Sequence, residues 1–121
     1  WDSMALDTIR KDYTIMRVTN LTSPRSGEPV ANQYEITSDD GATSTFQSYR
    51  TVIAKNTSGH FVISSDWNYS RTTSKYFHQW LRSFGLDGED IEGVKKFLKK
   101  ANYGDTDKSR SRFTLEYVEA L

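Results

Sequence analysis

The chain has 121 residues, 36% hydrophobic and 13% aromatic, and its 16 basic residues balance its 16 acidic ones. This length suits one hydrophobic core, so we expect a single domain. Because cysteine is absent, disulfides, thiolate metal sites and cysteine nucleophiles are excluded. The sequence shows neither a long apolar run nor a secretory leader pattern, which predicts a cytoplasmic protein with no membrane role.

The first residues differ from an ordinary protein start. Trp1, Asp2 and Ser3 precede Met4, and a natural chain ordinarily begins with methionine. We therefore expect residues 1–3 to be a cloning remnant and residues 4–121 to form the domain.

Five strands are predicted in the first half of the chain. Residues 13–20 are rich in β-branched and aromatic side chains and precede a polar loop with Pro24 and Gly27. Two hairpins follow, with turns at Asp39-Asp40-Gly41 and at Asn56-Thr57-Ser58-Gly59. The predicted hairpin strands are residues 33–37, 43–49, 52–55 and 60–64.

Two helices and a closing strand are predicted in the second half. Phe77, Trp80, Leu81 and Phe84 recur at helical spacing, with Thr72 or Thr73 as N-cap and Gly85 as the stop. In a second helix acids lead from Asp87 and four lysines follow, which complements the helix dipole. Residues 105–112 are predicted to be a mobile loop, and Phe113, Leu115 and Tyr117 alternate in a final strand.

This order of elements predicts an α+β fold. Short connections favour antiparallel neighbours, and helices that follow strands favour a separate helical layer. We expect an antiparallel sheet of about five to six strands with both helices packed on one face.

The segment between Phe46 and Phe84 concentrates aromatic rings and positive charge. It holds nine of the sixteen aromatic residues, and residues 50–82 contain five bases but one acid, Asp66. Such a mixture binds phosphates, bases or an acidic protein surface. Alternatively, Trp67 and Tyr69 belong to the core and the neighbouring threonines only cap the helix. The candidate partner-binding residues are Arg50, Trp67, Asn68, Tyr69, Arg71, Lys75, Arg110 and Arg112.

Two further basic segments have a functional and an ordinary interpretation. Lys96 and Lys100 are four residues apart on the second helix, which fits a phosphate-binding face or a solvated helix. Arg110 and Arg112 lie in a serine-rich loop that either reaches a partner or has none.

Signals for catalysis and cofactors are weak. His60 and His78 are the two histidines, and neither has a carboxylate at metal-ligand spacing or a recognisable triad context. Glycine-rich phosphate loops are absent from the sequence. We expect a protein that is not an enzyme and uses no cofactor or metal.

One part of the sequence resembles a family that carries no assigned activity. Residues 48–54 (Ser-Tyr-Arg-Thr-Val-Ile-Ala), residues 66–76 (Asp-Trp-Asn-Tyr-Ser-Arg-Thr-Thr-Ser-Lys-Tyr) and Trp80-Leu81 carry the pattern. They resemble a small uncharacterised domain that recurs in bacteriophage, prophage and plasmid genomes. The similarity spans about residues 34–81, and the extension from 87 to 121 has no counterpart in it. It implies a mobile-element accessory protein in a bacterial cytoplasm.

Three functions are consistent with these patterns. The first is a non-enzymatic protein that binds a host protein or ribonucleoprotein effector, as anti-CRISPR inhibitors of defence nucleases do. The second is a nucleic-acid-binding regulator, in which Arg71, Lys75, Arg110 and Arg112 contact phosphates while Trp67 or Tyr69 stacks on bases. The third is a structural component of a virion.

Overall fold

The structure, a computed structural model, describes residues 16–121. The predicted cloning remnant and the first three residues of the predicted opening strand lie outside this range. Seven strands, two α-helices and one 3₁₀ helix, η1, make up the described chain. In chain order they are β1 Met16–Thr22, β2 Pro29–Ser38, β3 Thr43–Ser48, β4 Thr51–Thr57, β5 His60–Ser64, η1 Ser65–Asn68, α2 Arg71–Arg82, α3 Gly88–Lys100, β6 Thr106–Asp107 and β7 Thr114–Val118.

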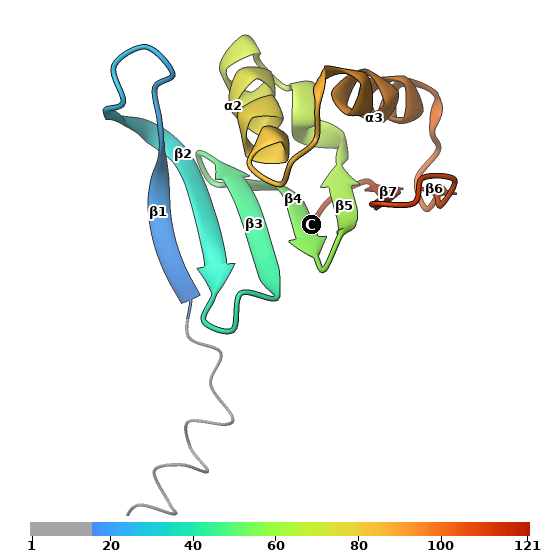
Figure 1. Cartoon of the computed structure of the whole chain (residues 1–121). Helices are drawn as coiled ribbons and strands as arrows, with labels where there is room; N and C mark the ends of the chain where they lie inside the picture. Colours follow the sequence, from blue (N-terminus) through green and yellow to red (C-terminus); the bar gives the residue numbers. More distant parts are fainter. Residues whose placement is uncertain (1–15) are drawn as a thin grey trace, which may run out of the picture.

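The strands form one mixed sheet in the order β1-β2-β3-β4-β5-β7-β6 (Figure 1). Strands β1 to β5 form an antiparallel meander, as predicted. Strand β7 instead pairs parallel with β5, with His60 opposite Thr114, and β6 adds an antiparallel edge. The prediction of a purely antiparallel sheet of five to six strands is therefore wrong. The reason is that the chain crosses over through two helices before β7, and such a crossover allows parallel pairing.

Local irregularities shape the strands. The register shifts between Asn20 and Thr22 in the β1–β2 pair, and between Phe46 and Gln47 in the β3–β4 pair. Such bulges bend a strand and increase its twist. Tyr49, in the tight β3–β4 turn, has a φ of 56°, a left-handed conformation that is uncommon for a tyrosine.

Both helices begin with a side-chain cap. Ser70, rather than the predicted Thr72 or Thr73, caps α2 and accepts a hydrogen bond from the backbone N–H of Thr73 at 3.1 Å. For α3, the carboxylates of Asp87 and Asp90 each accept a hydrogen bond from the other's backbone N–H, which is a capping box. The prediction that acids lead this helix and lysines end it is confirmed.

The helices cover only part of the sheet. In Figure 1, α2 lies over the middle strands and α3 lies over the end formed by β5, β7 and β6. Six of the seven residues of β1 are exposed, including Met16 and Val18. The predicted packing of two helices over one face is therefore right only in part, because the β1 end of the sheet projects past both helices.

Aromatic residues form the centre of the core. Trp80 is fully buried and packs against Phe46, Phe61 and Phe77, with ring centroids 5.7–6.3 Å apart. Its indole N–H donates to Ser44 Oγ at 3.0 Å. This cluster joins α2 to the sheet, while Ile91, Val94 and Leu98 bring α3 into the same core.

Candidate functional site

A groove lies where the β3–β4 turn meets the start of α2. Its volume is about 630 Å³, and its lining includes Tyr49, Arg50, Asp66, Tyr69, Ser70 and Thr73. We call it the tyrosine groove. It brings together two of the predicted binding residues, Arg50 and Tyr69, from segments about twenty residues apart in sequence.

Buried and capping hydroxyls fix the floor of the tyrosine groove. Ser48 Oγ and Thr73 Oγ1 are 3.0 Å apart and join the end of β3 to the first turn of α2. Ser70 Oγ also donates to Thr73 Oγ1 at 3.1 Å. The left-handed turn at Tyr49 then directs the chain into β4 beside this floor. The two walls are thus held in a defined relative position.

The rims of the tyrosine groove are aromatic and cationic. Tyr69 is 80% exposed and Tyr49 is 54% exposed. Arg50 is exposed and, within residues 16–121, forms no ion pair with a carboxylate. Asp66 is the acid on the groove wall. Exposed tyrosine rings and an exposed guanidinium therefore line the same concave surface.

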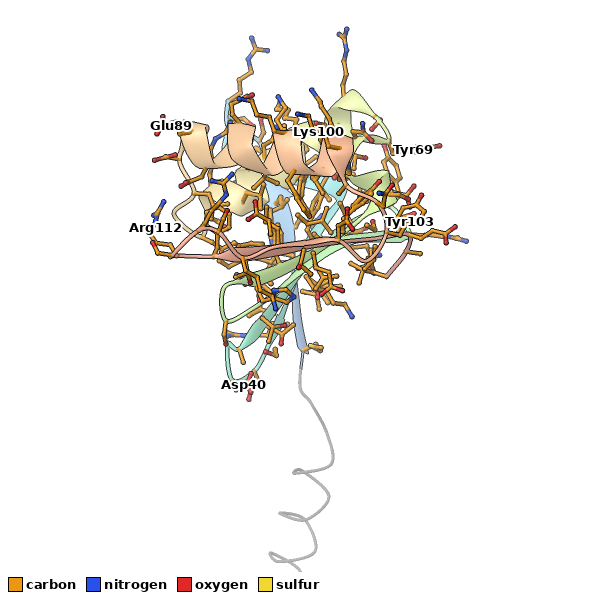
Figure 2. The ribbon with its side chains drawn as sticks, turned by 90° about the vertical axis from the view of Figure 1, so that its right-hand side faces the viewer. Asp40, Tyr69, Glu89, Lys100, Tyr103 and Arg112 are labelled. Atoms are coloured by element: carbon orange, nitrogen blue, oxygen red, sulfur yellow. The ribbon has the colours of Figure 1, made fainter. Side chains whose placement is uncertain are left out.

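The two aromatic candidates, Trp67 and Tyr69, differ in burial. Trp67 is 5% exposed and packs against Phe77 with ring centroids 6.2 Å apart. The hypothesis that Trp67 stacks on a partner is therefore wrong, because burial of the indole in the core hides both ring faces. The alternative core interpretation is confirmed for Trp67 but wrong for Tyr69, which projects from the surface at the label in Figure 2.

Asn68, Arg71 and Lys75 lie near the tyrosine groove but do not line it. Asn68 ends η1 and is exposed, and Arg71 is the first residue of α2, directly after Ser70. Lys75 is one turn further along, with its Nζ 5.3 Å from the centre of the Tyr76 ring. Like Arg50, both cations lack an ion-pair partner in the described part of the chain.

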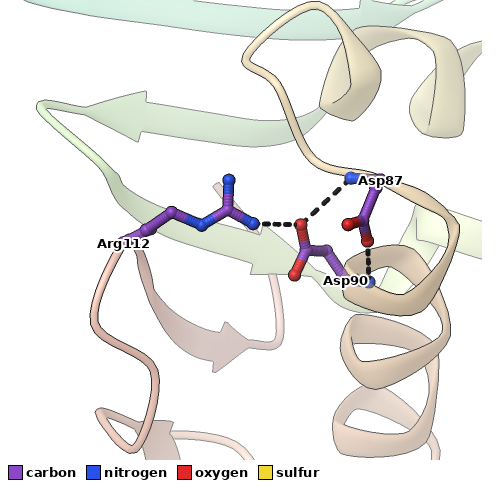
Figure 3. A network of polar contacts seen from close by, with 3 residues as sticks. All are labelled: Asp87, Asp90 and Arg112. Atoms are coloured by element: carbon purple, nitrogen blue, oxygen red, sulfur yellow. Dashed lines mark hydrogen bonds and ion pairs between the residues drawn. The ribbon is translucent and has the colours of Figure 1, made fainter.

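Arg112 is separated from the tyrosine groove. Figure 2 shows Arg112 and Tyr69 at opposite sides of the molecule. The Arg112 guanidinium bonds to Asp90 at 2.5 Å, so it joins the α3 capping box (Figure 3). The hydrogen bond from the Asp87 N–H, followed by the Arg112 interaction, lowers the pKa of Asp90. Arg112 thus pairs within the protein, and it lies apart from Tyr69 and the tyrosine groove rather than beside the other predicted binding residues.

Arg110 occupies a third position, beside α3. Its guanidinium carbon lies 5.7 Å from the centre of the Phe113 ring, and its Nε is buried with no hydrogen-bond partner within residues 16–121. The loop that holds it contains β6, which the sequence did not predict because two residues are too short to show alternation.

Seven of the nine residues that line the groove were not among the predicted binding residues, and Tyr49, Ser70 and Thr73 are three of them. Tyr49 directly precedes Arg50 at a strand end, and Ser70 directly precedes the basic residue that begins α2. A strand end and a helix start that both carry aromatic and basic residues were the available signal. What the sequence did not contain was the pairing of Ser48 with Thr73 that brings them together.

The structure brings three polar side chains together on β5 and β7. His60 Nδ1 lies 2.6 Å from Thr114 Oγ1, and His60 Nε2 lies 3.1 Å from Glu116 Oε1. The order hydroxyl, imidazole, carboxylate is that of a hydrolase triad, and it was invisible in sequence because the partners are 54 and 56 residues away. None of the three lines the tyrosine groove. Their contacts link the two parallel strands side by side.

Residues 16–121 also lack the features of a metal site and of a membrane-spanning helix. They hold no group of three His, Cys, Asp or Glu side chains arranged to bind a metal ion. Neither α2 nor α3 has the length and apolar character needed to cross a membrane.

Comparison with known proteins gives one match. A family model described as a family of unknown function (DUF8033) matches residues 16–113, which is most of the described domain. Searches of curated proteins and of solved structures found no match. The matched range includes strands β1 to β6, both helices and every residue that lines the tyrosine groove, and it ends just before β7. The chain therefore belongs to this family of unknown function, DUF8033.

Proposed function

We propose that this protein is a non-enzymatic binding protein that docks onto a protein partner through the tyrosine groove. The observation that carries the proposal is the meeting of exposed Tyr49 and Tyr69 around one concavity with Arg50, which has no ion pair within residues 16–121. Tyrosine and arginine are the side chains most enriched at energetically dominant positions of protein interfaces.

The support beneath the tyrosine groove favours binding of a defined partner. The buried Trp67 and the Ser48–Thr73 contact hold both walls before any partner arrives. A surface that is already ordered loses less conformational entropy on association. Tyrosine adds to this effect because its ring carries a large contact area on only two rotatable bonds.

The charge distribution favours a protein over nucleic acid as the partner. Asp66 lies on the groove wall, where it would repel a phosphate. Arg112 is paired with Asp90 and Arg110 lies beside α3, so both are outside the tyrosine groove, and the predicted basic surface near it is reduced to Arg50, Arg71 and Lys75. Sequence-independent binding of nucleic acid depends almost wholly on neutralising phosphates, for which three cations supply few contacts.

A single-stranded nucleic acid is the second candidate. It is favoured by the two exposed tyrosine rings beside the N-terminus of α2, since bases stack on rings and phosphates bind at helix N-termini. Asp66 and the small number of free cations weigh against it.

The resemblance to mobile-element proteins supports a narrower version of the first candidate. In that version the protein acts in a bacterial cytoplasm, and its partner is a host defence nuclease that it inhibits as anti-CRISPR proteins do. Because the charge is balanced, blocking a nuclease surface fits better than imitating a DNA duplex.

The direct test is a cleavage assay with purified CRISPR effector nucleases, with and without the protein. The protein is added in roughly tenfold excess, which is enough to saturate a micromolar interaction. We expect inhibition of at least one nuclease, and loss of that inhibition in Tyr69→Ala and Arg50→Glu. Arg25→Glu is the matched control, because Arg25 is exposed in the β1–β2 loop and does not line the groove. Inhibition that survives both groove variants would contradict the role of this surface.

A second measurement separates the two candidates. Labelled single-stranded and double-stranded DNA are titrated with the protein at a low and a physiological salt concentration. Phosphate contacts require binding that weakens steeply with salt. Salt-dependent binding lost in Tyr69→Ala would favour the nucleic-acid candidate, and absence of binding at low salt would exclude it.

A further inference from the structure

We propose that a second cavity, between α3 and β6, is a binding site for a ligand that carries a di- or triphosphate group. The cavity has a volume of about 690 Å³ and is lined by Lys96 and Lys100 of α3, by Arg110, and by Asp105 and Asp107 near β6. We call it the lysine cavity. It shares no lining residue with the tyrosine groove, so either proposal can fail without the other.

The three cations of the lysine cavity have no ion-pair partner in the described part of the chain. Within residues 16–121, Lys96, Lys100 and Arg110 form no ion pair, whereas Lys95 on the same helix pairs with Glu92 at 3.4 Å. Lys96 and Lys100 are one turn apart on α3, so their side chains project toward the same side. An anion that spans more than one charged oxygen group can contact both lysines at once.

The two acids of the lysine cavity are already engaged by their own loops. Asp105 accepts from the backbone N–H of Asn102 at 2.8 Å. Asp107 accepts from the N–H and hydroxyl of Ser109 at 2.9 and 2.6 Å, and these bonds lower its pKa. The charge of Arg110 also contributes to the lowered pKa of Asp107, so Asp107 offsets part of that charge. The three cations and two acids leave an excess of one positive charge at the cavity, which favours an anion over a cation.

Arg110 lies in the cavity wall, in the space left by the missing side chain of Gly93 in α3. At Gly93, an added Cβ would lie 2.8 Å from the Arg110 guanidinium carbon and closer still to one of its nitrogens. Glycine in the middle of a helix is unfavourable by roughly 0.5–1 kcal/mol relative to alanine. The guanidinium lies in the space that this glycine provides, against the Phe113 ring, with its Nε buried and without a hydrogen-bond acceptor in the described chain. The glycine thus provides the space for the Arg110 guanidinium, and Arg110 occupies it although its buried Nε without an acceptor costs free energy.

Helix electrostatics alone does not explain these cations. Lysines in the last turn of a helix offset the partial negative charge of its C-terminus, and Lys99 and Lys100 do so in α3. Lys96 precedes that turn, and Arg110 comes from another part of the chain. Both nevertheless line the same cavity as Lys100, and a bound anion would give the three side chains a common role.

The test is calorimetric titration of the full chain at low salt with three probes: pyrophosphate, ADP and a 5′-triphosphorylated oligonucleotide. We expect binding of at least one probe that weakens with added salt. Arg110→Gln and the double variant Lys96→Gln/Lys100→Gln should each weaken it about tenfold or more. Lys99→Gln is the matched control, since Lys99 is an exposed lysine on the same helix outside the cavity lining.

Gly93→Ala provides a test that changes no charge. Its methyl group must displace the Arg110 guanidinium, so binding should weaken although all cations remain. Thermal unfolding of each variant confirms that it is folded. Equal affinity for ADP and the oligonucleotide would identify a free nucleotide as sufficient, and much tighter binding of the oligonucleotide would identify a nucleic-acid end. Absence of binding to all three probes, or binding unchanged in Arg110→Gln and Gly93→Ala, would overturn the proposal.

Discussion

The tyrosine groove and the lysine cavity differ in what holds their side chains in place. Behind the groove lie the buried Trp67 and the Ser48–Thr73 contact, which belong to the core of the fold. Around the cavity lie Gly93 and the two-residue strand β6, and the Asp90–Arg112 pair is one turn nearer the start of α3. Substitutions behind the groove should therefore reduce stability strongly, whereas those beside the cavity should change local geometry and charge at small cost.

The largest expected effect tests the core support of the groove. Trp67→Ala should lower the free energy of unfolding by about 3–5 kcal/mol, because it removes a buried ring that packs against Phe77. Tyr69→Ala should change it by no more than about 0.5 kcal/mol, since Tyr69 is 80% exposed. Urea unfolding followed by circular dichroism measures both. If Trp67→Ala lowered the free energy of unfolding by less than about 1 kcal/mol, as an ordinary surface substitution does, the contrast between the two regions would be removed.

The next effect compares the helix caps on the two sides. Ser70→Ala at the groove and Asp87→Ala at α3 should each destabilise the protein by about 1 kcal/mol, because each removes an acceptor for an N-terminal N–H. Near neutral pH the two costs should be similar. Urea unfolding followed by circular dichroism at neutral pH measures both costs, and a cost below about 0.3 kcal/mol for either variant would contradict the role of its cap.

Acid should weaken the α3 side through Asp90. The Asp87 N–H and then Arg112 stabilise its charged form, so its folded-state pKa lies below the ordinary value of 3.8. The resulting stabilisation is present above that value and is lost as pH falls through the folded-state pKa. Asp90→Asn should flatten the stability curve in this range. An unchanged acid slope in Asp90→Asn would show that the Arg112 network contributes little.

The smallest effect concerns His78, which lies on α2 and senses charges of α3. Burial, followed by the charges of Lys95 and Arg82, lowers its pKa below 6.5, while Glu92 acts in the opposite direction. The unfolded chain therefore binds a proton more readily, so stability falls as pH decreases from 6.5 toward the folded-state pKa. NMR titration of the imidazole checks the direction, with exposed histidine in the urea-unfolded protein as reference. A folded-state value at or above 6.5 would contradict it.

Local patterns were sufficient for most elements of the fold. Alternation and turn residues predicted the meander of β1 to β5, and helical spacing with terminal charges predicted α2 and α3. The parallel place of β7 could not be predicted, because the alternation of Phe113, Leu115 and Tyr117 specifies a strand but not its neighbour. The cap of α2 was missed by two residues, since Ser70, Thr72 and Thr73 have equivalent side-chain chemistry.

The candidate site was predicted in composition but not in arrangement. Arg50 and Tyr69 meet at the groove, whereas Trp67 is buried and Arg112 binds Asp90. Residues that are close in sequence thus point in different directions. The direction of each side chain depends on core packing, which a list of residue types does not contain. Lys96 and Lys100 had the right spacing, but their third partner, Arg110, depended on the absence of a side chain at Gly93.

The position of β7 has a consequence for how the protein forms during translation. Because β7 lies between β5 and β6, the exposed edge of β5 has no neighbour until residues 114–118 have been made. A nascent chain stalled before this point would present a β5 edge rich in Phe61, Val62 and Ile63 to other chains. The timing of the last strand would then decide between a completed sheet and intermolecular association.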